Sequence, residues 1–139
     1  MKDYPAKEKI QNVLSVATGA LTGFAFLSFL TFFLLLALAS TANRDTESAE
    51  NSSLFAILAV LTTILSSLLA GYITAKISTR KTIIHLALTG LVLVLIMSAI
   101  SDFDWKTYSV SDWSGLLLTV PSTILGGIRV VIKESKSKI

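Results

Sequence analysis

Four long apolar runs dominate this sequence and restrict the chain to very few folds. The runs cover residues 13–41, 54–75, 82–100 and 114–132, and they contain no Asp, Glu or Lys. A helix rises about 1.5 Å per residue, so roughly 20 apolar residues cross a hydrocarbon core of about 30 Å. Because lipid cannot hydrogen-bond to the backbone, each run must be helical. The sequence therefore predicts an all-α, four-helix transmembrane bundle in one domain of residues 1–139.

The composition excludes an ordinary soluble domain of this length. Of the 139 residues, 53% are hydrophobic and 15% are charged, and the mean hydropathy is +0.72. A water-soluble fold this small could not bury so much apolar surface. The chain has no cysteine, which rules out disulfides and cysteine-based metal sites. The net charge of +3 comes from short basic patches between apolar runs, a pattern that favours anionic lipid over nucleic acid as the partner.

The charged residues outside the apolar core of the runs predict how the chain is threaded. Ten basic residues fall on one side of the predicted membrane: Lys2, Lys7, Lys9, Lys76, Arg80, Lys81, Arg129, Lys133, Lys136 and Lys138. The other side holds two basic residues, Arg44 and Lys106, and six acidic ones: Asp45, Glu47, Glu50, Asp102, Asp104 and Asp112. Lys and Arg are preferentially kept on the cytoplasmic side. We therefore expect both termini and the turn around Arg80 to be cytoplasmic.

Small residues predict which helix faces pack together. In lipid, apolar side chains gain little from burial, so helices associate through close backbone approach. At about 100° per residue, small residues line up on three of the four predicted helices. The first carries Gly19 and Gly23, the second Ser67 and Gly71, and the fourth Gly115, Ser122 and Gly126. On the first helix the same stripe includes Ser15 and continues through Phe26, Leu30, Phe33 and Ala37, and we expect the whole stripe to face other helices.

The predicted spans carry little that could support catalysis. Intramembrane ionisable residues usually mark proton relays and ion paths, and Arg129, near the end of the last run, is the only charged one. His85 has no second His or Cys with which to share a metal ion. A hydrolytic triad is disfavoured because His85 is expected inside the cell and most loop acids outside. We therefore expect no enzyme activity, no cofactor and no metal site.

Two polar groups leave alternatives open. Side chains on the second predicted helix could line a passive channel or form hydrogen bonds between helices: Thr62, Thr63, Ser66 and Ser67. The segment 68–90 holds a second group between two apolar runs: Lys76, Arg80, Lys81 and His85. Its three basic residues help to set the topology of a cytoplasmic turn. All four are also candidates for contact with lipid headgroups or with a partner protein.

One pattern spans the end of the second predicted helix and the start of the third. It consists of Gly71, Tyr72, Ile73, Thr74, Ala75 and Lys76, then, after the basic turn, His85, Leu86 and Ala87, with Leu-Gly-Gly at residues 125–127. It resembles the motif G-[YF]-[VI]-x-[AG]-[KR], followed by H-G-A, of small four-span bacterial membrane proteins of uncharacterised function, the DUF3792-like group. Leu86 stands where that motif has glycine. The resemblance implies a bacterial inner-membrane protein of this topology and brings no activity, substrate or catalytic residue.

Small-residue faces without buried acids or lysines are typical of a membrane protein that works through helix contacts. Our leading hypothesis is a non-enzymatic accessory or assembly subunit in the cell membrane. The alternative is a small oligomeric channel or transporter, and a third class is a module whose cytoplasmic face docks lipid or a partner. The expected partners are membrane lipid and either further copies of the chain or a membrane protein complex, and not nucleic acid.

Overall fold

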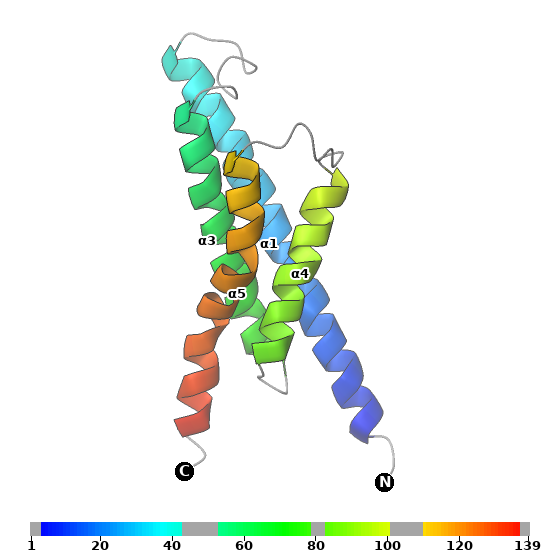
Figure 1. The fold of residues 1–139 in the computed structure, drawn as a ribbon. Helices are drawn as coiled ribbons and strands as arrows, with labels where there is room; N and C mark the ends of the chain where they lie inside the picture. Colours follow the sequence, from blue (N-terminus) through cyan, green and yellow to red (C-terminus); the bar gives the residue numbers. More distant parts are fainter. Residues whose placement is uncertain (1–3, 43–52, 79–82, 101–109, 137–139) are drawn as a thin grey trace.

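Four α-helices make up the part of the chain that the structure describes. In this computed structural model, the described residues are 4–42, 53–78, 83–100 and 110–136. The helices, labelled in Figure 1, are α1 (Tyr4–Ala42), α3 (Ser53–Ile77), α4 (Ile83–Ile100) and α5 (Val110–Lys136). All four are long and apolar enough to cross a membrane, and the described residues contain no strand. The predicted all-α fold with four helices of membrane-spanning length is confirmed.

The helices α1 and α5 extend well beyond the apolar runs that predicted them. The first run begins at residue 13, whereas α1 begins at Tyr4. Ala6, Lys7 and Glu8 favour helix, and Pro5 lies in the first turn, where its missing N–H costs no hydrogen bond. Likewise, α5 continues past residue 132 to Lys136. Apolar runs locate the part of a helix that fits in lipid, but polar residues that favour helix prolong it into water.

The helices alternate in direction, and α1 and α5 stand on opposite sides of the bundle. α1 and α5 each contact α3 and α4, and α3 contacts α4, while no contact joins α1 to α5 in the described part of the chain. Figure 1 shows that α1 and α4 begin at the end of the bundle where α3 and α5 finish. We call this the basic end, because five cationic residues whose side chains the structure describes lie there: Lys7, Lys9, Lys76, Arg129 and Lys133.

The core of the bundle consists of small and hydroxyl-bearing side chains, while most large apolar side chains face outward. The fully buried hydroxyl residues are Ser15, Ser66, Ser67, Thr74, Thr89, Thr119 and Thr123. The buried apolar residues are Ala20, Ala70, Ala75, Leu86 and Leu93. Large apolar side chains lie exposed on every helix, among them Leu21, Leu61, Leu95 and Leu117. Such a surface suits lipid as the solvent, because a leucine gains little there by moving inward.

α3 and α5 cross with their backbones in contact, and glycines on both helices make this possible. A Cβ atom added to Gly71 would overlap the backbone carbonyl of Thr123, and one added to Gly126 would overlap that of Leu68. Gly127 lies at the same crossing, and its added Cβ would be 2.9 Å from the carbonyl oxygen of Gly71. A side chain could enter these contacts only by moving a backbone, so all three positions require glycine.

Two glycines bring α1 onto α3 in the same way. A Cβ atom added to Gly19 would overlap the hydroxyl of Thr74 and lie 2.9 Å from the carbonyl oxygen of Ala70. One added to Gly23 would lie 2.7 Å from the Cβ of Ala70. Both glycines are buried, as is Ala20 between them. The predicted face of the first helix therefore packs against α3 at its glycines.

Of the other predicted packing positions, Gly115 fits less closely than the two serines suggest by their burial. Ser67 and Ser122 are buried on α3 and α5. Gly115 is also buried, but an added Cβ would lie 3.9 Å from Thr63, which is an ordinary contact. Gly90 on α4 is tighter, since its added Cβ would lie 2.9 Å from the Cα of Val120. The sequence pattern missed Gly90 because no second glycine accompanies it on that helix.

The outer half of α1 does not pack as its stripe predicts. The buried residues of α1 are Asn12, Ser15, Gly19, Ala20 and Gly23. None of residues 24–40 is buried. Phe26 and Leu30 are half-buried, but Phe33 is 52% exposed and Ala37 is exposed, so the prediction that the stripe faces other helices is wrong at Phe33 and Ala37. Large side chains hold helix backbones apart, so the close contact of α1 ends where its glycines end.

Gly71→Ala and Gly126→Ala are each expected to destabilise the bundle, because the new methyl group would overlap a carbonyl of the facing helix. Overpacking of this kind costs about 1–3 kcal/mol. Gly115→Ala is the matched control, since its methyl group would have 3.9 Å of space. Thermal unfolding in mild detergent measures the difference, and equal midpoints for all three variants would contradict the crossing.

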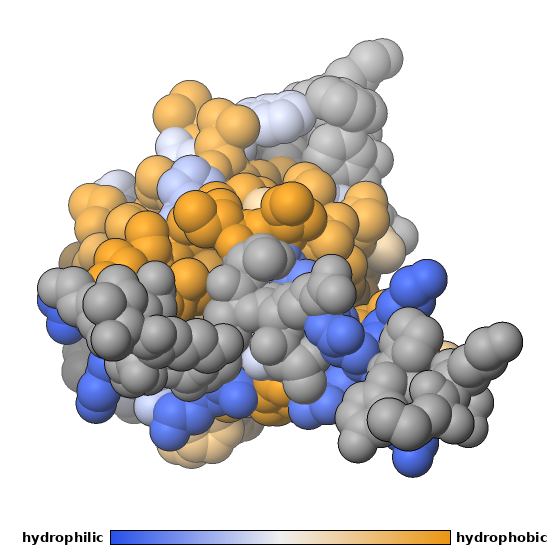
Figure 2. All heavy atoms as spheres, turned by 90° about the horizontal axis from the view of Figure 1, so that it is seen from below, coloured by the Kyte–Doolittle hydropathy of each residue, from blue (hydrophilic) through white to orange (hydrophobic). Residues whose placement is uncertain are grey.

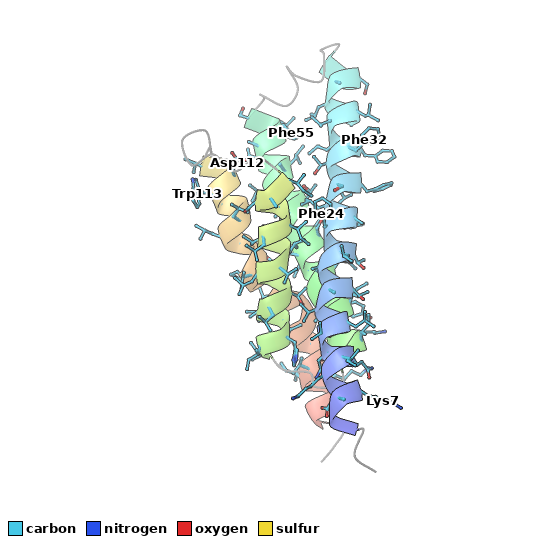
Figure 3. The ribbon with its side chains drawn as sticks, turned by 90° about the vertical axis from the view of Figure 1, so that its right-hand side faces the viewer. Lys7, Phe24, Phe32, Phe55, Asp112 and Trp113 are labelled. Carbon is cyan, nitrogen blue, oxygen red and sulfur yellow. The ribbon has the colours of Figure 1, made fainter. Side chains whose placement is uncertain are left out.

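The charges predict that the basic end faces the cytoplasm, and the absence of cysteine makes this easy to check. Lys7 and Asp112 are exposed and lie at opposite ends of the bundle (Figure 3). Lys7→Cys should react with a membrane-impermeant maleimide only after the cells are opened, whereas Asp112→Cys should react in intact cells. The reverse pattern would show that the predicted orientation is wrong.

Candidate functional site

A hydroxyl network inside the bundle joins three helices. Its centre is the fully buried Thr74 of α3. Thr74 Oγ1 lies 3.0 Å from Ala70 O on its own helix, 3.4 Å from Ser15 O on α1 and 3.0 Å from Thr89 Oγ1 on α4. Thr89 Oγ1 in turn lies 2.9 Å from His85 O. The two hydroxyl protons thus have four contacts to choose among, and each of the two hydroxyl groups has a hydrogen-bond partner within the bundle.

A second polar contact fastens α1 to the end of α3. Ser78 Oγ donates a hydrogen bond of 3.0 Å to Asn12 Oδ1, and both residues are buried. Gln11 Nε2 donates a bond of 3.3 Å to the carbonyl of Ile77. That carbonyl is one of those that a helix C-terminus leaves without a partner in its own helix. These bonds set the register of α1 along α3 near the basic end.

The hydroxyl groups of α3 that could have lined a channel donate hydrogen bonds to carbonyls of α3 itself. Thr62 and Thr63 both donate to Ala59 O at 2.9 Å, and Ser66 and Ser67 donate to the carbonyls of Thr62 and Thr63 at 2.8 and 2.7 Å. Ser66 and Ser67 are fully buried, and Thr63 is 7% exposed. Among the described residues, every buried side-chain nitrogen or oxygen has a hydrogen-bond partner. Within one chain, these hydroxyl groups are satisfied by their own helix, so α3 can pack this face against its neighbours.

The basic end gathers exposed cations from three helices: Lys7 and Lys9 of α1, Lys76 of α3, and Arg129 and Lys133 of α5. Figure 2 looks onto this end and shows hydrophilic side chains beside broad apolar surface. The Nζ atom of Lys76 lies 5.3 Å from the centre of the Tyr72 ring, a cation–π distance. Two of the predicted headgroup contacts, Arg80 and Lys81, lie outside the described residues, whereas Lys76 and His85 both lie at this end.

His85 occupies the first turn of α4 and is half-buried. The residue after it, Leu86, is buried against Gly127 of α5, and the carbonyl of His85 accepts the bond from Thr89. The packing of α4 on α5 therefore places the histidine near the basic end. In the part of the chain that the structure describes, no three His, Asp or Glu residues are grouped so that they could hold a metal ion.

Sequence reasoning missed Asn12 and Thr89, which both become contacts between helices. Asn12 lies just before the first apolar run, and Thr89 lies inside the third. Buried polar side chains in membrane helices usually bond to a neighbouring helix, so their polarity was a usable signal. Their partners, Ser78 and Thr74, could not be read from the sequence, because each pair depends on how two helices align.

Comparison with known proteins adds no function to this geometry. No protein-family model matches the sequence. No curated protein and no solved structure matches it either. The resemblance to the DUF3792-like group stays a prediction, and the function has to be inferred from the residues themselves.

Thr74→Val should destabilise the bundle, because valine keeps the shape but removes the hydroxyl that joins α1, α3 and α4. Hydrogen bonds between membrane helices contribute about 0.6–2 kcal/mol. Thr119→Val is the matched control, because Thr119 is equally buried and its hydroxyl bonds only to Gly115 O, within α5. Thermal unfolding in detergent compares the two variants. An equal loss in both would mean that the link between helices contributes nothing of its own.

Proposed function

We propose that the protein is a non-enzymatic accessory or assembly subunit of a membrane complex and works through helix contacts. The observation that carries the proposal is the incompletely covered outer half of α1, where none of residues 24–40 is buried. In the most apolar window of α1 only 6% of the residues are buried, against 22–28% in the other three helices. The helix is thus much less covered by its own chain than its neighbours are.

An aromatic face marks this outer half. Phe29, Phe32 and Phe33 are 52–58% exposed, and Leu36, on the next turn, is 46% exposed. The rings of Phe29 and Phe33 have centroids 4.6 Å apart, and those of Phe32 and Phe33 meet edge to face at 5.7 Å. Figure 3 shows Phe32 pointing away from the other helices. We call these four residues the aromatic face.

The aromatic face favours a protein partner over lipid alone because its rings are already ordered against each other. Helix association in lipid is driven by van der Waals packing, which rewards a fixed shape more than apolar character. Ordered rings lose little conformational freedom on binding. The occupant we propose is a membrane-spanning helix of another subunit, which lies along α1 within the bilayer.

A location in the bacterial inner membrane belongs to the same proposal. Its support is the concentration of cationic residues at one end of four helices of membrane-spanning length. The resemblance to four-span bacterial proteins points the same way. Among the described residues, the bundle leaves no buried side-chain nitrogen or oxygen unpaired, which fits a role in assembly better than one in chemistry.

Photo-crosslinking in native membranes tests the proposed partner. A benzophenone amino acid in place of Phe32 should form a protein adduct of one defined mass, because the partner helix covers that face. The matched control is the same substitution at Leu117 of α5, which is 71% exposed and also lies among apolar neighbours. Mass spectrometry of the adduct identifies the partner, which is either one other membrane protein or a second copy. Only lipid adducts at both positions would contradict the proposal.

A further inference from the structure

The outward faces of α3 and α5 both change from apolar to basic at the same end of the bundle. On α3, exposed leucines at Leu61 and Leu65 are followed on the same face by Tyr72 and Lys76. The exposed residues of α5 follow the same order: Leu118, Leu125, Arg129 and Lys133. A ligand that lies along either face therefore meets apolar side chains first and cations second.

The first cations on the two helices both lie beyond the crossing, toward the basic end. The contacts at the crossing join Gly71 to Thr123 and Gly126 to Leu68. At about 1.5 Å per residue, Lys76 lies about 8–12 Å beyond these contacts along α3, and Arg129 lies about 5–9 Å beyond them along α5. His85 reaches a similar level, because the residue after it packs on Gly127. We call Lys76 and Arg129 the upper pair.

The depth of the upper pair matches the edge of a bilayer. Along α3, the distance from Lys76 back to the first residue, Ser53, is about 34 Å. Along α5, the distance from Arg129 back to the acidic residue of the first turn, Asp112, is about 26 Å. These lengths lie on either side of the hydrocarbon thickness of about 30 Å. The upper pair therefore reaches the level of the lipid phosphates when the apolar parts of both helices fill the membrane.

Further cations lie one step deeper on the cytoplasmic side. Lys133 lies about 6 Å beyond Arg129 along α5. On α1, the bond between Asn12 and Ser78 sets the level, and Lys9 lies about 5 Å beyond Asn12. We call Lys9 and Lys133 the lower pair. The exposed cations of the basic end thus lie at more than one level, so a phosphate between two levels can meet charge from both. Among the residues whose side chains the structure describes, the acidic residue at this end is Glu8.

We propose that the basic end binds anionic phospholipid, with headgroup phosphates at the levels of the upper and lower pairs and acyl chains along the exposed apolar residues of α3 and of α5. An acidic protein could use the cations, but it would have no use for the apolar side chains that lead directly to them. Lys76, held over the Tyr72 ring, keeps its charge at the membrane surface while its stem remains in apolar surroundings. This binding is independent of the partner proposed for α1.

Native mass spectrometry of the whole chain, released from nanodiscs of phosphatidylglycerol and phosphatidylcholine, tests the binding. The wild type should retain phosphatidylglycerol in preference. The double variant Lys76→Gln/Arg129→Gln should retain about tenfold less, because each cation near the surface contributes to anionic lipid binding. The control Lys7→Gln/Lys136→Gln removes the same charge farther from the apolar faces and should change retention by less than about threefold.

Three outcomes would overturn the proposal. They are equal retention of both lipids by the wild type, equal losses in the double variant and its control, and displacement of the lipid by a polyglutamate peptide at the same charge concentration. The last outcome would assign the surface to an acidic protein. Thermal unfolding in neutral detergent shows whether each variant is folded, and because Lys76 and Arg129 are exposed we expect a wild-type midpoint for the double variant.

Discussion

The crossing of α3 and α5 is the contact on which the rest of the bundle depends. Gly71 and Gly126 let each backbone reach a carbonyl of the other helix, and Gly127 completes the contact. In water, large apolar side chains would hold such helices together at a wider spacing. In lipid those side chains are equally stable on the outside of the bundle, so attraction comes from van der Waals contact between closely spaced backbones. The helices that approach most closely therefore form the centre.

The helices α4 and α1 join this pair through similar close contacts at glycine residues. α4 lies on α5 at Gly90, and α1 lies on α3 at Gly19 and Gly23. Once backbones are this close, short hydroxyl side chains reach across, as Thr74 reaches both α1 and α4. The asymmetry of the molecule follows, because α3, α4 and α5 carry the polar core, whereas α1 joins it only between Asn12 and Gly23.

The buried hydroxyl groups of the core are used for packing, so sites for partners are expected on the surface of the bundle. Two surfaces differ from plain leucine and isoleucine: the aromatic face of α1 and the basic end. They lie toward opposite ends of the molecule (Figure 3), so a protein partner within the bilayer and an anionic headgroup at its edge can bind together. Both proposals assign the protein a role in recognition within the membrane, in keeping with spans that lack acids and lysines in their apolar parts.

The sequence by itself determined the four helices and which helix ends share a side, because the length of an apolar run and the position of charges act on each segment separately. It also marked Gly71 and Gly126, since few other residues allow such contact. Only the tertiary structure decided that Gly90 and Thr89 face the core, that Gly115 fits loosely and that none of residues 24–40 of α1 is buried. The physical reason is that α4 is apolar on all sides, so its sequence has no polar face that reports which side turns inward, and that the closeness of a contact depends on the facing helix as well.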